Sequence, residues 1–498
     1  MKVVRLRDNR FGAKGCSFRR NGDGWIADEN EGIGEQSVSN AQQKLLEQFK
    51  NPYFGTLESL AKIGVVELSG SHLEESDRKS LRFLEYHPTA DGFRLDTGNA
   101  MGVLRFREPD DGASIQVEVL SRFDKRDGNF FLNYLLSKAL DIAPSSESVT
   151  AQSSALLDLL LDFLFVRKLG EAARGGLLRQ YQTFRNNDWA FKGRLDLSRH
   201  IRENVPLMYG IAYEKREIDL DVPVNRMLLL AAQAVRSRRP ELFERNEEAQ
   251  DAFQTLQVSI PAPGDIRTVL SYRDCREPVT HPFYRETWEP LRLISRMILE
   301  GEEWQLFQDA DEPEVSGVVF DGAWLWEEYL ASVLSKKGFR HCGKGIGGGL
   351  PVFNPGRSRF YPDFYKHDDD ISKRIVLDAK YKRSNPNGGR NDVHQILCYL
   401  LLTGARSGGL VFPPVDKSCE GPEALQAEEN GIVTDEGGWS PKKEIDTPYG
   451  NPNSINWSCF TWAGVRGNNW QEFCDYMETQ EKALRDVIEQ SNMSVVSD

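Results

Sequence analysis

The residues best suited to chemistry lie in the run RFYPDFYKHDDDISKRIVLDAKYKR, which spans positions 359–383. Within this run, Pro362 and Asp363 precede the triplet Asp378, Ala379 and Lys380. The apolar residues before Asp378 predict a buried strand, on which side chains two positions apart share a face, so Asp378 and Lys380 point the same way. If the segment around Asp363 forms the neighbouring strand, two carboxylates and one ammonium group meet at one point.

This combination of charges is suited to binding a divalent cation and hydrolysing a phosphodiester. Two close carboxylates repel each other, and Mg²⁺ relieves the repulsion because it prefers oxygen ligands. A bound cation makes its water more acidic, and Lys380 could orient that water and stabilise the negative charge that grows on the phosphate. The sequence therefore predicts cleavage of DNA or RNA at Asp363, Asp378 and Lys380.

Two predicted helices could bring further side chains to the same point. In NDVHQILCYLLL, Gln395 and Tyr399 are four residues apart and therefore share one helical face. In AWLWEEYL, either Glu327 or Glu328 could add a carboxylate, and the sequence leaves open which of them faces the metal. The tripeptide DAK alone occurs often by chance, but the ordered set of helix Glu, Pro-Asp, Asp-x-Lys and Gln-x-x-x-Tyr is far more specific.

Other polar motifs near this site are expected to be structural. The acids at 368–370 are typical of a solvated turn between strands. The stretch HCGKGIGGGLP (341–351) lacks the order of a phosphate-binding loop and predicts a connection between strands. His394 has no Cys or His partner that would indicate zinc. The seven cysteines are scattered, without a CxxC pair, and favour neither a disulfide framework nor a structural zinc site.

Composition indicates a globular protein of several domains. The chain has 498 residues, of which 40% are hydrophobic and 28% charged, enough to bury more than one core. Its 62 basic and 75 acidic residues give a formal charge of −13, which argues against a general cationic coat for nucleic acid but not against a local basic site. Because no apolar run could span a bilayer and the N-terminus lacks a secretory signal, we expect a cytoplasmic protein without a membrane partner.

The pattern along the chain predicts an α/β multidomain protein in three parts. Residues 1–145 mix strand-like runs, at 62–70 and 114–124, with turns, and predict a small mixed α/β domain. Residues 146–305 are mainly helical. Residues 306–498 have an α/β order, with an insertion near 416–456 and a final amphipathic helix.

The helical middle part is interrupted over residues 180–204 by a predicted hairpin or loop. Its basic tip, formed by Lys192, Gly193 and Arg194, could contact a partner. A solvated turn without a partner would produce the same pattern, and the sequence does not separate the two.

These motifs resemble the PD-(D/E)xK nuclease superfamily. The signature positions are occupied by Pro362, Asp363, Asp378 and Lys380, and Gln395 to Tyr399 matches an extension seen in RecB-like members. More narrowly, IVLDAKYKRS, HQILCYLLL and SGGLVFPPVD resemble, in that order, the C-terminal domain of the McrC family of restriction nuclease subunits. The middle region, from GGLLRQYQTF to NRMLLLAAQAV, is similar to the same family, so the resemblance covers about residues 120–415.

The resemblance implies a restriction-endonuclease-like fold for residues 306–498, in which helices flank a mixed sheet. It implies an endodeoxyribonuclease that uses Mg²⁺, with Mn²⁺ able to substitute. The implied metal ligands are Asp363, Asp378, the backbone carbonyl of Ala379, and Glu327, which matches the family's helix glutamate better than Glu328 does.

The resemblance also implies a partner and a substrate. The partner would be a McrB-like AAA+ hexamer that hydrolyses GTP under stimulation by this chain and that contacts residues 1–145 and 146–305. The substrate would be methylated double-stranded DNA. GTP would bind to the partner, in keeping with the absence of a Walker motif from this sequence. A LlaJI-like or other AAA+-coupled defence nuclease, and a non-catalytic adaptor that activates the ring GTPase, stay open as alternatives.

Overall fold

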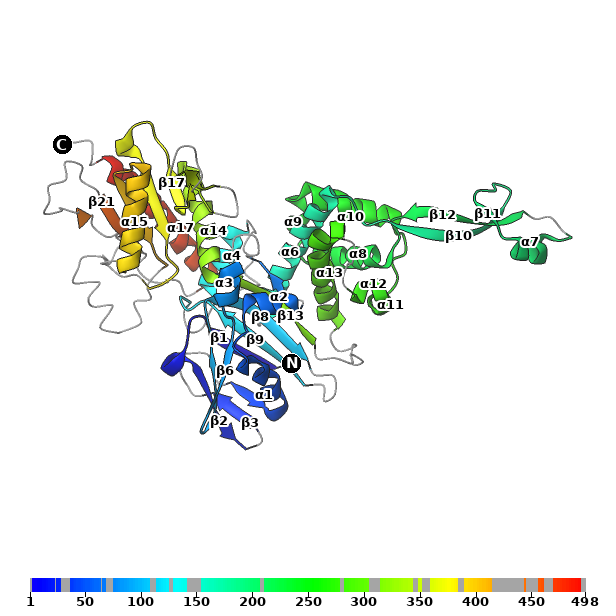
Figure 1. Ribbon diagram of the computed structural model, residues 1–498, viewed down its shortest axis with the longest axis horizontal. Coiled ribbons are helices and arrows are strands. Elements are labelled where there is room, and N and C mark those ends of the chain that lie inside the picture. Colours follow the sequence, from blue (N-terminus) through cyan, green and yellow to red (C-terminus); the bar gives the residue numbers. More distant parts are fainter. Residues whose placement is uncertain are drawn as a thin grey trace. The chain divides into compact units, whose positions relative to one another are not determined.

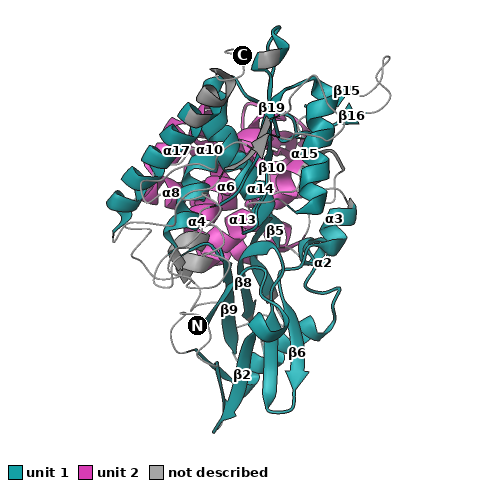
Figure 2. Cartoon of the chain, turned by 90° about the vertical axis from the view of Figure 1, so that its left-hand side faces the viewer, with its two compact units in different colours: residues 1–157, 309–498 teal, residues 158–308 magenta. Residues whose placement is uncertain are grey.

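The protein folds into two compact units of mixed α/β structure. The computed structural model describes residues 2–22, 24–27, 36–63, 65–68, 75–107, 113–124, 129–140, 154–206, 210–277, 282–303, 314–343, 348–351, 359–383, 389–413, 443–444, 456–460 and 469–493. One unit comprises residues 1–157 and 309–498, and the other comprises residues 158–308 (Figure 2). The predicted mixed α/β class is confirmed, and the segments predicted as N-terminal and nuclease domains lie together in the first unit.

A five-stranded sheet contains strands from both chain segments of the first unit, 1–157 and 309–498. Its strand order is β1-β9-β8-β13-β5. The strands span Lys2–Arg7 (β1), Ser114–Leu120 (β9), Ala100–Arg107 (β8), Glu314–Asp321 (β13) and Val66–Glu67 (β5). The strand predicted over 62–70 is wrong in extent, because among the described residues of this range only Val66 and Glu67 form a strand, and the helix α2 (Leu57–Lys62) reaches Lys62.

A second five-stranded sheet, with the order β4-β3-β2-β7-β6, completes the N-terminal part of this unit. Its strands are Ser37–Ser39 (β4), Gly24–Ala27 (β3), Cys16–Asn21 (β2), Gly92–Asp96 (β7) and Glu85–Thr89 (β6). The accompanying helices are Asn40–Leu46 (α1), Leu57–Lys62 (α2) and Glu75–Ser80 (α3). The sheet is held by an aromatic core in which Phe93 stacks on Phe18 and on Tyr86.

The candidate site lies on a six-stranded mixed sheet with the order β14-β17-β18-β19-β21-β20. Its strands are Arg340–His341 (β14), Phe364–Lys366 (β17), Ile375–Ala379 (β18), Ser407–Val411 (β19), Asn456–Phe460 (β21) and Lys443–Glu444 (β20). Strand β18 is antiparallel to β17 and parallel to β19. A separate pair is formed by Leu350–Pro351 (β15) and Arg359–Phe360 (β16). The predicted insertion near 416–456 lies largely outside the described residues.

Helices cover both faces of this sheet. They are Phe130–Ala139 (α4), Gly322–Leu334 (α14), Arg390–Thr403 (α15) and Trp470–Met493 (α17). Helix α15 connects β18 to β19 and lies on the side of the sheet opposite α17 (Figures 1 and 2). Ile396 and Leu400 of α15 pack with Val376 and Leu410 of the sheet. Gly404, in the left-handed conformation with φ of 68°, ends α15 and turns the chain into β19.

The second unit is a group of helices from which a long hairpin extends (Figure 1). The helices are Ser154–Arg174 (α6, which begins in the first unit), Pro223–Arg238 (α8), Pro240–Glu244 (α9), Glu247–Ser259 (α10), Ile266–Ser271 (α11), Arg273–Arg276 (α12) and Pro282–Glu303 (α13). The hairpin contains Gln180–Asp188 (β10), Arg194–Leu195 (β11), Leu197–Asn204 (α7) and Ile211–Asp219 (β12). No helix among the described residues is long and apolar enough to cross a membrane.

Candidate active site

The pairing of β17 with β18 brings the two predicted aspartates together. Phe364 lies opposite Leu377 in this antiparallel ladder, so the next pair outward is Asp363 and Asp378. The backbone N–H of Ala379 donates a hydrogen bond of 2.6 Å to Oδ2 of Asp363. This bond fixes the Asp363 carboxylate at the end of β18.

Asp378 and Lys380 form an ion pair at the end of the same strand. Asp378 is 1% exposed, and its Oδ2 lies 2.5 Å from Nζ of Lys380. Because side chains alternate along a strand, Asp378 lies on the same face as Val376, which packs against α15. This alternation directs both charged groups toward α15, as predicted from the sequence.

Helix α15 continues the polar contacts from Lys380. The Nζ of Lys380 donates a hydrogen bond of 2.8 Å to Oε1 of Gln395. Nε2 of Gln395 then donates to the hydroxyl of Tyr399 at 3.0 Å. The Tyr399 hydroxyl donates in turn to the backbone carbonyl of Tyr361 at 3.1 Å. The predicted helical pair therefore orders Lys380 and is tied back to the segment that precedes Asp363.

Burial and mutual repulsion control the protonation of these groups. Burial, followed by the negative charges of Asp378 and Glu327, raises the pKa of Asp363 well above its ordinary value. Burial also raises the pKa of Asp378, although the ammonium group of Lys380 opposes the shift. For Lys380, burial is the largest influence and acts to lower the pKa, but the carboxylates of Asp378, Asp363 and Asp392 together outweigh burial, and the pKa is raised. Lys380 therefore carries a positive charge at neutral pH.

Glu327 approaches the site from α14. Removal from water raises its pKa to about 8, and the charges of Asp321 and Asp378 act in the same direction. Its Oε2 also lies 4.0 Å from Nε2 of His341. Across the described ranges, no three His, Cys, Asp or Glu side chains converge closely enough to hold a metal ion. Glu327 is thus an electrostatic neighbour of the aspartate pair.

The aspartate pair has the properties of a site for a hard cation. Oδ1 of buried Asp378 has no hydrogen-bond partner of good geometry among the residues that the structure describes. An unpaired buried acceptor is costly, and two adjacent carboxylates repel each other. A divalent cation would satisfy both conditions, and two carboxylates are a usual protein contribution to a Mg²⁺ site. The donors present therefore fit such an ion.

The other residues singled out in the sequence add no observed side-chain contact to the aspartate pair in the described part of the chain, although the backbone N–H of Cys342 in the Gly-rich stretch donates a 3.0 Å hydrogen bond to the carbonyl of Asp363. The acids at 368–370 form a turn closed by a 2.9 Å hydrogen bond from the Asp370 N–H to Asp368. His394 is exposed on α15. The Gly-rich stretch 341–351 connects β14 to β15, and its residues 344–347 lie outside the described part. Lys192, Gly193 and Arg194 are exposed in the hairpin of the second unit.

Sequence reasoning missed the residues that surround the end of β18. Tyr381, next to Lys380, is buried against residues more than 250 positions earlier in the chain, including Ser121. Lys382 pairs with Asp392, whose carboxylate also accepts a 3.2 Å hydrogen bond from the Gly389 N–H at the start of α15. The aromatic residue in DAKY was the available signal, because an aromatic side chain at a strand end commonly packs into a core.

Comparison with known families decides the relationship of the chain. The family model described as "McrBC 5-methylcytosine restriction system component" matches residues 95–413. The chain belongs to this McrBC family. The match includes Glu327 and the whole run from Asp363 to Tyr399, as well as the hairpin of the second unit.

The McrBC family is also represented among solved structures similar to this chain. One is the refined half-complex from the tetradecameric assembly of Thermococcus gammatolerans McrB AAA+ hexamers with bound McrC, at 13% identity and a TM-score of 0.44, covering 97% of this chain and 100% of that chain. Another is the Thermococcus gammatolerans McrBC complex, at 15% identity and a TM-score of 0.28, covering 67% and 87%. No curated protein matches the chain.

Proposed function

We propose that this chain is the DNA-cutting subunit of a McrBC-type restriction system and that its nuclease domain has the PD-(D/E)xK fold. The reaction would be Mg²⁺-dependent hydrolysis of phosphodiester bonds in modified, methylated double-stranded DNA. The observation that carries the proposal is the grouping of Asp363, Asp378 and Lys380 at the end of β18, with Lys380 bonded to Gln395. Membership of the McrBC family supplies the biological context.

Asp363 and Asp378 would hold the cation, together with the backbone carbonyl of Ala379. The mutual repulsion of the two carboxylates, which helps to raise the pKa of Asp363, and the unpaired Oδ1 of Asp378 support this assignment. When bound, Mg²⁺, or Mn²⁺ in its place, supplies charge neutralisation at the phosphate and a more acidic water. Glu327 would be a further ligand from α14, because a bound cation would favour the charged form of this carboxyl group, which burial and the neighbouring carboxylates otherwise disfavour.

Lys380 is suited to act as a fixed positive charge rather than as a general base. Its raised pKa keeps it as an ammonium group, and its contacts with Asp378 and Gln395 fix its position. A fixed positive charge stabilises the additional negative charge on a phosphate during attack and can orient the attacking water. Gln395 limits the freedom of Lys380, and Tyr399 holds Gln395.

A local basic rim gives DNA a place to approach an otherwise acidic chain. Residues 371–390 contain six Lys or Arg and a single acid, Asp378. Three of the cations, Lys382, Arg383 and Arg390, are exposed between the end of β18 and the start of α15. Phosphate contacts of this kind position DNA without reading its sequence, which is consistent with recognition by a partner.

The partner would be a McrB-like AAA+ hexamer that binds and hydrolyses GTP. The hairpin of the second unit is the surface that we assign to it. Trp189 and Leu197 of the hairpin are 62% and 60% exposed, and Phe191, Leu195 and Ile201 are also exposed. Large exposed apolar side chains at a projecting tip are typical of a protein interface. Lys192, Gly193 and Arg194 lie among them and would contact the ring and stimulate its GTPase.

The experiment is a cleavage assay with the full-length chain, its McrB-like partner, GTP, and plasmid DNA with or without 5-methylcytosine. We expect cutting of methylated DNA only when Mg²⁺ or Mn²⁺ is present, and none with EDTA. Partner GTPase is measured in the same samples. Stimulated GTPase without cutting under any metal condition would contradict the nuclease assignment and favour a non-catalytic adaptor.

A further inference from the structure

The residue that follows Lys380 is anchored in a different part of the first unit. Tyr381 is 7% exposed, and its hydroxyl lies 2.9 Å from Oγ of Ser121, just after β9. Its ring packs edge-on against Phe123 with centroids 5.1 Å apart. An added Cβ at Gly322 would come within 2.6 Å of this ring, so the start of α14 also packs closely against Tyr381.

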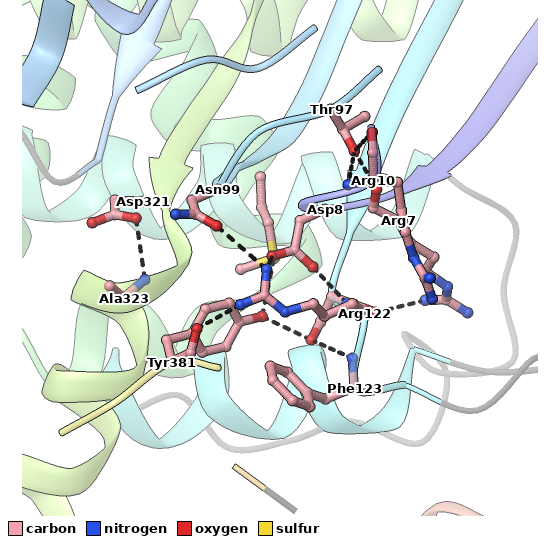
Figure 3. A network of polar contacts seen from close by, with 12 residues as sticks. Arg7, Asp8, Arg10, Thr97, Asn99, Arg122, Phe123, Asp321, Ala323 and Tyr381 are labelled. Atoms are coloured by element: carbon pink, nitrogen blue, oxygen red, sulfur yellow. Dashed lines mark hydrogen bonds and ion pairs between the residues drawn. The ribbon is translucent and has the colours of Figure 1, made fainter. Parts of the chain in front are cut away.

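Arg122 holds Tyr381 through two contacts, a hydrogen bond to its backbone and a cation–π contact with its ring (Figure 3). Its Nη2 donates a hydrogen bond of 2.5 Å to the backbone carbonyl of Tyr381, and its guanidinium carbon lies 4.9 Å from the centre of the Tyr381 ring. The side chain of Arg122 is 9% exposed. A planar guanidinium can make both contacts at once, whereas an ammonium group cannot.

Asp8 and Asn99 hold Arg122 in turn (Figure 3). Oδ1 of Asp8 accepts a 2.6 Å hydrogen bond from the backbone N–H of Arg122, and Oδ2 accepts one of 3.0 Å from Nη1. Nη1 also donates to Oδ1 of Asn99 at 3.3 Å. Asp8 is fully buried at the end of β1. The grip on Tyr381 is therefore built from strand ends that lie far from the nuclease sequence in the chain.

The backbone turn from Lys380 to Lys382 couples the position of Tyr381 to that of Lys380. The N–H of Lys382 donates to the carbonyl of Lys380 at 2.9 Å, which makes a tight turn with Tyr381 at its centre. The Lys380 N–H donates to Val411 of β19 at 2.9 Å. Tyr381 points to Ser121, whereas Lys380 points to Asp378 and Gln395. Fixing one side of this turn fixes the direction of the other.

We propose that Arg122, oriented by Asp8, is a positioning residue for DNA cleavage, which acts by holding Tyr381 so that Lys380 stays directed at Asp378. The inference rests on the proposed nuclease function and deepens it. It also gives the N-terminal sheet a role in the cutting step.

A structural role alone does not account well for these contacts. Burying an arginine and a carboxylate costs desolvation, and well-packed apolar side chains would join the two sheets at least as stably. What the charged pair adds is direction, because the guanidinium hydrogen bonds define the position of one backbone carbonyl. An error of about 1 Å at a catalytic group can reduce turnover about a hundredfold.

The test compares Arg122→Lys with Arg94→Lys in the full-length chain, assayed with its partner, GTP, Mg²⁺ and methylated DNA. Arg94 is a matched control, since it makes two hydrogen bonds to Asp96 in the same unit and, within the described part of the chain, makes no hydrogen bond or ion pair to Tyr381, Arg122 or Asp8. We expect Arg122→Lys to lower kcat for cutting by about 10- to 100-fold. The KM for DNA and the stimulation of partner GTPase should stay within twofold of wild type, and Arg94→Lys should cut normally.

Asp8→Asn is the second variant, because asparagine keeps the shape of the aspartate side chain. It tests the inference if Arg122→Lys fails to fold. A several-fold loss in kcat at unchanged KM is expected from it. A wild-type kcat in Arg122→Lys would overturn the inference but not the proposed nuclease function. If Arg122→Lys does not fold, a wild-type kcat in Asp8→Asn would have the same meaning. Equal losses of kcat, GTPase stimulation and thermal stability would overturn the inference in favour of a purely structural role. No cutting by the wild-type protein would overturn the proposed function itself.

Discussion

At the scale of single residues, the site depends on how firmly Lys380 is held. The ammonium group has one ionic contact, with Asp378, and one neutral contact, with Gln395. The first keeps the group charged, and the second sets the direction from which it can approach a phosphate. Gln395 has no alternative role in the sheet core, because that core is formed by the neighbouring Ile396 and Leu400.

Gln395→Ala should therefore lower cutting without lowering stability. We expect kcat to fall by about 10- to 100-fold, the range typical of lost outer-shell support for a functional group. Tyr399→Phe removes only the hydroxyl that holds Gln395, so its loss should be smaller. Single-turnover cleavage at saturating Mg²⁺ measures both. A larger loss in Tyr399→Phe than in Gln395→Ala would contradict the order of contacts.

The catalytic candidates could be predicted from the sequence because they are close in the chain. Strand alternation was enough to pair Asp378 with Lys380, and helical spacing was enough to pair Gln395 with Tyr399. The support from Arg122 and Asp8 could not be predicted, since no local pattern connects them to Tyr381. It follows from the way the ends of β1, β9 and β18 meet.

At the scale of elements, the long helices could be predicted and the short strands could not. Periodicity identifies α8 and α14 because each repeats an apolar face over several turns. The strands β5 and β20 have two residues each, which is too short for any alternation to register. The place of β13 beside β8 also could not be predicted, because about 200 residues separate the paired strands.

The hairpin tip offers a prediction about an element. Gly193 has a φ of +114°, and an added Cβ would lie 2.3 Å from the carbonyl oxygen of Glu214. Gly193→Ala should distort the tip and lower partner GTPase stimulation several-fold. Gly176→Ala is a matched control, since its φ is +89° but no atom lies within 4 Å. Equal stimulation by the two variants in a GTPase titration would contradict a role for the tip.

A second prediction concerns the start of α4. The Asp124 carboxylate accepts hydrogen bonds from the N–H groups of Phe131 and Leu132 at 2.7 and 3.3 Å, and burial raises its pKa from 3.8 to about 7. A carboxyl group whose pKa is raised by folding contributes stability at low pH, and this contribution is lost as pH rises through about 7. Asp124 therefore lowers stability at neutral pH relative to acidic pH.

Asp124→Asn should remove this pH dependence. Between pH 5.5 and 8 the wild-type protein should lose about 2 kcal/mol of unfolding free energy relative to the variant. Urea unfolding at the two pH values measures the difference, and Asp91→Asn, in an exposed turn, serves as the control. Parallel pH profiles for wild type and Asp124→Asn would contradict the assignment.

At the scale of the whole molecule, the charge distribution supports the proposed separation of cutting from recognition. A chain with a formal charge of −13 repels DNA at long range, and the exposed cations near the site include Lys382, Arg383 and Arg390 among the described residues. Such a rim can bind the phosphate backbone of DNA that a partner has already brought to the site. It is not suited to searching for a sequence or a modified base.

The isolated chain should therefore bind DNA weakly and with a shallow salt dependence. Three phosphate contacts predict a slope of log K against log salt of about −3, with a dissociation constant above about 10 µM at 0.15 M salt. Fluorescence anisotropy with a labelled duplex measures both. A slope of about −6 or steeper would indicate a second DNA-binding face and would contradict a division of labour with the partner.

The most direct test of the nuclease assignment measures cutting and partner GTPase together in Asp378→Asn and Asp369→Asn. Asp378 is buried beside Lys380, whereas Asp369 is fully exposed in a turn. We predict that Asp378→Asn lowers cutting of methylated DNA by about a thousandfold or more, while GTPase stimulation stays within twofold. Asp369→Asn should match wild type in both assays. Normal cutting by Asp378→Asn would contradict the account.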